Sequence, residues 1–462
     1  MLLSSGIAAG HPATADAGAE ILEAGGTAAD AAVAASLASC VAETVMTGLL
    51  GGGHAIWWDA AEERASLLDF FVAVPGLGAE PRHVELVELH VPFGAEMVHY
   101  AVGVGSCAVP SVPQGLGELH ARHGRLRWER LVEPALRLAR GGVEMPPAHA
   151  SCLAMLAPVM TMREGAGLYS PGGRLLEAGD LLEQPGLARA LELLAEEGPE
   201  SMATGSLARA LLELVNERGG LVTEEDLRAY RPAWLEAQEA SYAGRRILTR
   251  GGLSGIMPAL AALPPLRGAP PAERCRALVA AFAPAHGLGR TTNLAVADAE
   301  GNACVLTTSL GLGSGDWLPG LDLHLNSMLG ETDLLVGPLE PGTRMASMMA
   351  PTLALDERGP ELAIGAAGGT RLRSALVQVL AGILEDGLAP QAAVDRPRIH
   401  PAGPLVHAEP GLDESAAAAL EADGFEVRRW PALHHYFGGV SAVGRDGLGA
   451  DPRRSGAARA RP

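Results

Sequence analysis

Residues 291–310 read TTNLAVADAEGNACVLTTSL, and this stretch decides the fold. Residues 292–298 alternate apolar and polar side chains, which is typical of a β-strand. The tetrapeptide AEGN at 299–302 has the composition of a turn, and residues 303–309 return as a second strand. The pattern therefore predicts a β-hairpin with Thr291 at its leading end.

Thr291 is a candidate nucleophile. A threonine hydroxyl is weak without a base, but a threonine that begins a chain can use its own α-amine, with a pKa near ~8, to take the hydroxyl proton. Residues 286–290, HGLGR, predict a flexible loop in which the chain can be cut. Gly368 and Gly369 follow an apolar strand around Ile364, and such glycines let backbone N–H groups approach a developing oxyanion. The same features also suit an ordinary strand start and an ordinary turn, so the pattern alone leaves both interpretations open.

The N-terminal part of the chain predicts small-residue and amphipathic helices around one strand pair. Thr223, with Asp226 three positions later, predicts a capping box at a helix start. The expected elements are a helix at 12–42 broken at Gly25-Gly26, strands at 54–58 and 66–71, two helices within 112–142, and helices within 180–230.

The C-terminal part predicts a mixture of strands and helices. Residues 258–289 are rich in proline and alanine and predict a linker. Arg453 and Arg454 predict a surface pair or a pair that ties subunits together. The other expected elements are strands near Leu353 and Leu362, a helix at 374–384 and a final strand around Val440.

Composition excludes several classes of protein. The chain has 462 residues, of which 48% are hydrophobic and 19% charged, so it can bury a large core and is not a disordered chain. Its formal net charge of −19 repels phosphates, so no nucleic-acid partner is expected. The sequence contains no long apolar, uncharged run and no basic leader at its start, so we expect a cytoplasmic protein with no membrane partner.

The five cysteines are odd in number, widely scattered and without a CxxC pair. This spacing argues against a disulfide framework and a structural zinc site, and favours buried free thiols. The adjacent His434 and His435 point to opposite faces if they lie on a strand, so they predict structural or surface histidines. We expect no metal and no cofactor.

Many segments, in order along nearly the whole chain, resemble the γ-glutamyltransferase (γ-glutamyltranspeptidase, glutathione hydrolase) family. The segments that carry the resemblance are GHPATADAGAEILEAGGTAADAAVAA (10–35), GLLGGGHAIWW (48–58), VPQGLGELHARHGRLRWERLVEPALRLARGG (112–142), GGLVTEEDLRAY (219–230), TTNLAVADAEGNACVLTTSL (291–310), PGTRMASMMAPTLAL (341–355), GAAGGTRL (365–372), AAVDRPRIH (392–400) and DPRRSG (451–456).

The resemblance implies an α/β fold, the αββα four-layer sandwich of N-terminal-nucleophile hydrolases. It also implies self-cleavage of the Arg290–Thr291 bond. The products are a large-subunit-like segment, 1–290, and a small-subunit-like segment, 291–462, which stay associated as two halves of one body. A homodimer of this cleaved pair is left open.

The resemblance also assigns roles to residues around the nucleophile. Thr291 matches the family's nucleophile, and Ser309 stands where the family has a threonine that supports the nucleophile's hydroxyl. Gly368 and Gly369 match the oxyanion glycines. Ser347 stands at the second of two paired serines that hold the substrate carboxylate.

The substrate pocket departs from the family pattern. Gly311 replaces the usual asparagine, and Phe71 replaces an arginine of the family. No arginine falls at the position that clamps the substrate carboxylate, and Arg82 is the nearest candidate for it. The segment from Met328 to Arg344 is short, which implies a reduced lid. The residues expected to contact the substrate are Ser347, Asn326, Ser327, Glu331 and Arg82.

Three functions remain open from the sequence. The first is cleavage of γ-glutamyl amide bonds, as in glutathione, by hydrolysis or by transfer to an amine. The second is an amidohydrolase or acylase of different acyl specificity on the same machinery. The third is an uncleaved chain that only binds a metabolite.

Overall fold

The predicted hairpin lies in the middle of a seven-stranded sheet in the computed structural model, which describes residues 2–80, 82–93, 96–282 and 291–461. Strands β11 (Thr292–Ala297) and β12 (Ala303–Ser309) pair antiparallel, with Thr292 opposite Thr308. The strand order is β22-β1-β11-β12-β2-β3-β8. The other five strands are β1 (Gly6–Ala9), β2 (Gly52–Asp59), β3 (Arg64–Phe70), β8 (Ala233–Leu235) and β22 (Ala457–Ala460).

A six-stranded sheet stacks on the first, and residues far apart in sequence form its strands. Its order is β21-β20-β16-β15-β10-β9. Asn293 of β11 links the two sheets: its side chain donates to the Gly439 carbonyl at 3.1 Å and accepts from the Ser441 N–H at 3.1 Å. The strands are β9 (Gln238–Tyr242), β10 (Arg245–Thr249), β15 (Thr352–Asp356), β16 (Gly359–Ala367), β20 (Gly439–Gly444) and β21 (Gly447–Ala450).

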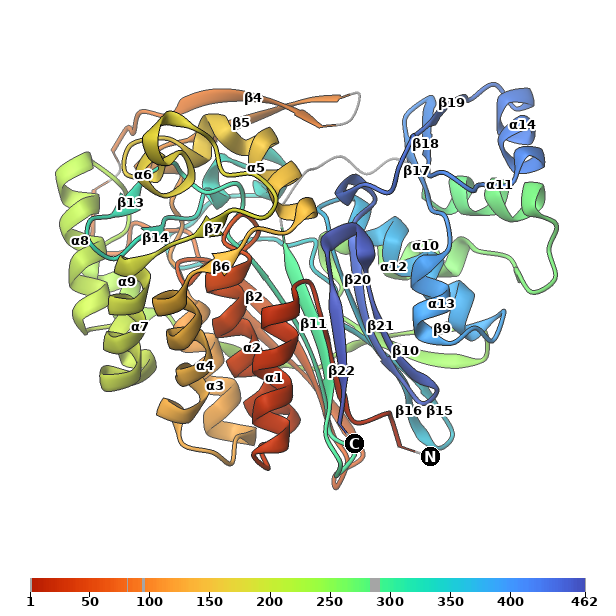
Figure 1. Ribbon diagram of the computed structural model, residues 1–462, viewed down its shortest axis with the longest axis horizontal. Helices are drawn as coiled ribbons and strands as arrows, with labels where there is room; N and C mark the ends of the chain where they lie inside the picture. Colours follow the sequence, from red (N-terminus) through yellow and green to blue (C-terminus); the bar gives the residue numbers. More distant parts are fainter. Residues whose placement is uncertain (1, 81, 94–95, 283–290, 462) are drawn as a thin grey trace.

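Helices cover the outer faces of both sheets, so the molecule has the expected αββα order of layers (Figure 1). One helical layer contains α1 (Pro12–Glu23), α2 (Ala28–Ala42), α3 (Val112–His123), α4 (Trp128–Gly141), α7 (Pro185–Glu197) and α8 (Ser206–Arg218). The other contains α10 (Ile256–Ala262), α11 (Pro271–Ala281), α12 (Arg371–Leu384), α13 (Pro390–Asp395) and α14 (Glu414–Ala422).

Smaller elements surround this sandwich. The Thr223–Asp226 capping box is present at the start of α9 (Glu224–Ala229), as predicted. The remaining strands and helices are β4 (Val87–Phe93), β5 (Glu96–Val102), β6 (Val143–Glu144), β7 (Leu181–Leu182), α5 (Pro147–Met160), α6 (Gly165–Tyr169), β13 (Trp317–Leu318), β14 (Leu323–His324), β17 (Ile399–Ala402), β18 (Leu405–Ala408) and β19 (Glu426–Arg429).

The two faces of β11 lie in different apolar layers. Leu294 and Val296 pack with the helices of the first layer, whereas Ala295 and Ala297 pack between the two sheets. Side chains alternate along a strand, so both faces are buried and all six residues of β11 are inaccessible to solvent. Even-numbered residues of β11 therefore face the helices, and odd-numbered residues face the second sheet.

The predicted linker at 258–289 is wrong for the residues that form helices, whereas residues 263–270 are an irregular connection between α10 and α11. Residues 258–262 belong to α10, and α11 contributes Cys275 and Leu278 to the core beside the second sheet. The prolines misled the interpretation because Pro271 occupies the first turn of α11, where a missing N–H is tolerated. Residues 283–289 lie outside the described residues.

Other predictions about the whole chain can be compared with the structure. All five cysteines are free and buried, as predicted. Among the described residues, no cluster of three His, Cys, Asp or Glu side chains is placed to hold a metal ion. No helix in the described ranges is long and apolar enough to span a membrane.

Candidate functional site

Thr291 lies at the end of the sandwich where the predicted catalytic residues meet. It directly precedes β11 and is only 4% exposed. Ser309 ends β12 on the neighbouring strand, and Thr292 pairs with Thr308 at the same edge. Gly368 follows β16 in the second sheet, where Ala367 pairs with Gly439. The fold therefore brings together segments that are about sixty to eighty residues apart in the sequence.

Strand alternation gives the two adjacent threonines different surroundings. The Thr292 hydroxyl donates to a carboxylate oxygen of Glu43 on the helix side of the sheet. The Asn293 side chain points to the second sheet. Thr291 lies two positions earlier, so strand alternation directs its side chain to the same face. Ser309 shares the face of Val305, which packs between the sheets. Thr291 and Ser309 are thus placed on the face that looks toward the second sheet.

Gly368 and Gly369 have a conformation and a place that suit an oxyanion site. Their φ angles are +133° and +60°, and a Cβ on Gly368 would lie 2.9 Å from the Cα of Gly438. Their carbonyls accept from Arg371 and Leu372 in the first turn of α12. The N–H groups of a helix start carry partial positive charge, which favours an anion there. Their role in catalysis remains a prediction.

The cavity beside Thr291 is small. Its volume is about 10 Å³, close to the least that holds one water molecule, so no acyl side chain fits in it. It is lined by Gly10, Glu43, Met46, His149, Thr291, Thr292, Asn293, Ala367, Gly439, Val440, Ser441, Asp451 and Arg454.

Glu43 is a buried carboxyl group in this cavity that the sequence interpretation missed. The hydroxyl of Thr14 donates to its second oxygen at 2.7 Å. Burial raises the pKa of Glu43 to about 7, against the opposing effects of the Thr292 and Thr14 hydrogen bonds and the charge of Arg454. A polar residue directly after the apolar run of α2 was the available signal.

Arg453 and Arg454 are buried, so the prediction of a surface pair is wrong. Arg453 forms ion pairs with Glu409 and Asp451, and Asp451 also accepts from Arg398 at 2.6 Å. Arg454 lies beside the cavity, with its guanidinium 2.9 Å from the sulfur of Met46. These cations hold the C-terminal segment against the end of the second sheet where Gly368 lies.

Two of the polar residues predicted to contact substrate, Asn326 and Ser347, bond to main-chain groups of nearby loops. Asn326 is fully buried, and its amide bonds to the main chain of Leu50, Ala108 and Met328. Ser347 is also buried, and its hydroxyl accepts from the Met349 N–H at 3.2 Å. These side chains hold loops in place, and their contact with substrate remains a prediction.

Ser327 and Glu331 lie next to the supporting serine. The Gly311 N–H donates to the Ser309 hydroxyl at 3.1 Å, and the Ser327 hydroxyl accepts from Leu312 at 3.0 Å. A Cβ on Gly311, whose φ is +68°, would lie 2.5 Å from Glu331 Oε1 and 2.7 Å from Ser327 Oγ. The absence of a side chain at position 311 therefore leaves the space that Glu331 and Ser327 occupy.

Arg250, another residue missed from the sequence, is the cation beside Ser347. Its guanidinium donates to the Ser347 carbonyl at 2.9 Å, and burial lowers its pKa. Asp69 is the negative charge near Arg250, but its Oδ1 also lies 3.5 Å from Nε of Arg344. Arg250 and Arg344 therefore share one carboxylate. Arg82 is exposed and lines no part of the cavity beside Thr291.

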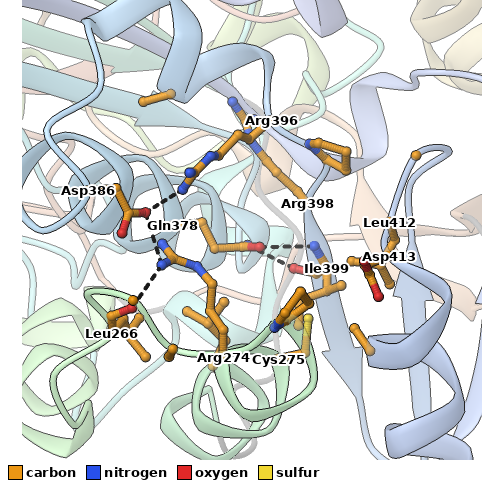
Figure 2. A pocket seen from close by; sticks show the side chains of 18 residues that line it. Leu266, Arg274, Cys275, Gln378, Asp386, Arg396, Arg398, Ile399, Leu412 and Asp413 are labelled. Atoms are coloured by element: carbon orange, nitrogen blue, oxygen red, sulfur yellow. Dashed lines mark hydrogen bonds and ion pairs between the residues drawn. The ribbon is translucent and has the colours of Figure 1, made fainter.

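A larger hollow lies elsewhere, between α11, α12 and α13 (Figure 2). Its volume is about 420 Å³, and none of the predicted site residues lines it. Arg274 and Arg396 both pair with Asp386 across it, and Gln378 bonds to the main chain of Ile399. Its charged groups already have partners, so it offers no chemistry comparable to that at Thr291.

Comparisons with known proteins show the family of this chain. The family described as gamma-glutamyltranspeptidase matches residues 14–276 and 268–460. The chain belongs to the γ-glutamyltranspeptidase family. The acylase ACY 1 proenzyme of Pseudomonas sp. strain V22 is 30% identical over a 504-residue alignment that covers 94% of this chain and 88% of the relative. The glutathione hydrolase proenzyme of Bacillus subtilis strain 168 is 25% identical over 473 aligned residues, 85% of this chain and 80% of that one.

A solved structure gives the same fold. The cephalosporin acylase from Bacillus halodurans superposes with a TM-score of 0.83, at 24% identity, over 100% of this chain and 97% of that one. The predicted N-terminal-nucleophile αββα fold is confirmed, and the protein is an enzyme of the hydrolase type found in the γ-glutamyltranspeptidase family. Relatives with acylase and glutathione hydrolase names leave the acyl group open.

Proposed function

We propose that the chain cuts itself between Arg290 and Thr291, and that Thr291 then hydrolyses γ-glutamyl or closely related amide bonds. The observation that carries the proposal is that Thr291 borders the same small cavity as Ala367, the residue before Gly368, and that Ser309 ends the strand paired with β11.

The chemistry has two steps. The α-amine of Thr291, freed by cleavage, takes the proton of the Thr291 hydroxyl, and the oxygen attacks the amide carbon of the substrate. Backbone N–H groups of Gly368 and Gly369 stabilise the oxyanion, the amine leaves with the proton, and an ester to Thr291 remains. Water then attacks the ester, and its proton returns through the α-amine to the Thr291 oxygen.

A γ-glutamyl group presents a carboxylate and an ammonium, and both must be paired when they leave water. Arg250, which carries the excess positive charge beside Ser347, is the group suited to the carboxylate. Glu331, next to Ser309 and Ser327, is the group suited to the ammonium.

The second candidate is an acylase whose acyl group lacks the α-amine. The acylase ACY 1 relative, at 30% identity, favours it, and so does the loss of the usual asparagine at Gly311. The two candidates differ in whether Glu331 contributes to substrate binding.

Two experiments test the proposal. Intact-mass measurement and N-terminal sequencing of the purified protein should find two fragments, one beginning at Thr291; a persistent single chain would favour the metabolite binder. Initial rates are then compared for γ-glutamyl, glutaryl, 4-aminobutyryl and butyryl p-nitroanilides, which differ only in the amine and carboxylate. We expect the γ-glutamyl compound to be the best substrate, and an equal or faster rate on glutaryl anilide would identify the acylase.

A further inference from the structure

Glu43 has a fixed position in contact with Thr292, the residue that follows the expected nucleophile. It ends α2, where its N–H donates to the Ser39 carbonyl at 2.8 Å and its own carbonyl accepts from Met46 at 2.7 Å. Hydroxyl groups of Thr14 and Thr292 donate to its two carboxyl oxygens. The carboxyl group is therefore held on the helix side of the sheet, directly behind the leading end of β11.

Chain geometry places the future α-amine close to this carboxyl group. The nitrogen of Thr291 is joined to Thr292 by a few covalent bonds, so it lies within about 7 Å of the Thr292 hydroxyl. Glu43 accepts a hydrogen bond from that hydroxyl. Thr291 and Glu43 also line the same cavity. Thr291 and Glu43 thus border one cavity, and the Thr291 nitrogen lies within reach of the carboxyl group across it.

Among the ionisable groups near the cavity, Glu43 is the one whose negative charge is available to pair with a charged amine. Asp451 is already paired with Arg398 and Arg453, and Arg454 has no negative charge to offer an amine. Burial lowers the pKa of His11 to about 4 and that of His149 to about 3, and it raises the pKa of the Cys40 thiol, so these three groups are neutral near pH 7.

Self-cleavage creates an amine that can carry a charge at this buried place. A buried ammonium is costly unless an anion accompanies it. We propose that Glu43 is a positioning residue that pairs with the α-amine of Thr291 after self-cleavage, an inference that rests on the proposed function. The carboxyl group orients the amine toward the Thr291 hydroxyl and sets the pH at which the amine becomes a base.

The sign of the effect on pH follows from the charge. Burial raises the pKa of Glu43 to about 7 in the uncleaved chain, and a neighbouring ammonium favours its ionised form. The ionised carboxylate in turn stabilises the ammonium and so raises the pKa of the amine. The amine must be neutral to accept the hydroxyl proton, so activity is lost as the pH falls below that pKa. Glu43→Gln removes the charge, and the acid limb of kcat/KM should then move to lower pH by on the order of one unit. Poorer orientation should lower the plateau by about tenfold.

The experiment compares wild type, Glu43→Gln and a matched control, Glu385→Gln. Glu385 is also a buried carboxyl group, but it accepts from Tyr242 and Leu266 in the other helical layer. For each protein, the extent of cleavage, Tm and the pH profile of kcat/KM on the best substrate are measured. We expect only Glu43→Gln to shift the acid limb, with cleavage still taking place. An unchanged limb would overturn the inference, even if stability and rate fell.

A second variant covers the case in which Glu43→Gln does not fold. Thr292→Val keeps the charge of Glu43 but removes the hydroxyl that it holds, so we expect a lower plateau and little shift of the limb. A wild-type plateau in this variant would overturn the positioning role. A wild-type protein that is neither cleaved nor active would instead overturn the proposed function, and the inference with it.

Discussion

Replacing Arg250 by methionine separates the binding of a substrate carboxylate from the rest of catalysis. Methionine removes the positive charge and keeps an unbranched side chain in the partly buried position. A lost charge-assisted hydrogen bond costs about 1.5–3 kcal/mol, which corresponds to ~10–150-fold in affinity. We expect kcat/KM to fall by that factor for γ-glutamyl and glutaryl anilides, and to change little for butyryl anilide, which has no carboxylate.

Two other arginines serve as controls for this measurement. Arg82→Met changes an exposed cation away from the cavity and should leave all three rates near wild type. Arg344→Met removes a cation whose guanidinium bonds to the carbonyls of Phe71 and Arg231, so it should lower Tm without changing the preference for a carboxylate. The reasoning is refuted if Arg250→Met lowers the three rates by one common factor, because Arg250 would then only hold the Ser347 loop.

Three further predictions concern the nucleophile, the C-terminal segment and the glycine beside Glu331. Thr291→Ala should abolish both self-cleavage and turnover, since one hydroxyl performs both attacks; a gel that still shows two fragments meeting at residue 291 would assign the attack to another group. Arg453→Met should cost about 3–5 kcal/mol in urea unfolding, because Glu409 keeps a buried charge without that partner. Adding Glu409→Met should restore most of that loss, and an additive further loss would contradict the ion-pair explanation. Gly311→Ala should cost roughly 1–3 kcal/mol, because φ is +68° and the new Cβ meets Glu331; unchanged unfolding would mean that this loop rearranges freely.

Local sequence patterns were sufficient to predict the hairpin and the first helix pair, whereas the αββα layers were expected from the family resemblance. Period-2 alternation at 292–309 and the small-residue helix pair at 12–42 predict elements that the structure has with nearly the same bounds. These signals are local, since each depends on residues within one element. The prolines at 270–271 misled the prediction for the opposite reason, because a proline at a helix start and a proline in a linker look alike in sequence.

Contacts between distant segments could not be predicted in this way. Glu43 meets Thr292 across 249 positions, and Arg250 meets Ser347 across 97. The neighbouring sequence gives no sign that Glu43 and Arg250 are buried, because a carboxylate after a helix and an arginine after a strand are usually solvated. Arg82, the candidate for the missing arginine, illustrates the limit, because its exposure to solvent could not be read from its place in the sequence.

If the chain is cut before Thr291 as proposed, the alternation of Thr291 and Thr292 has a consequence for the lifetime of the cleaved enzyme. A protease that trims one residue from the new chain end would leave another threonine in first place, with the same hydroxyl and a fresh amine. Its hydroxyl, however, is turned to the helices and engaged by Glu43. The trimmed protein would therefore carry an intact terminal threonine and still be inactive. A chemical test that detects only a terminal threonine would not distinguish active from inactive enzyme.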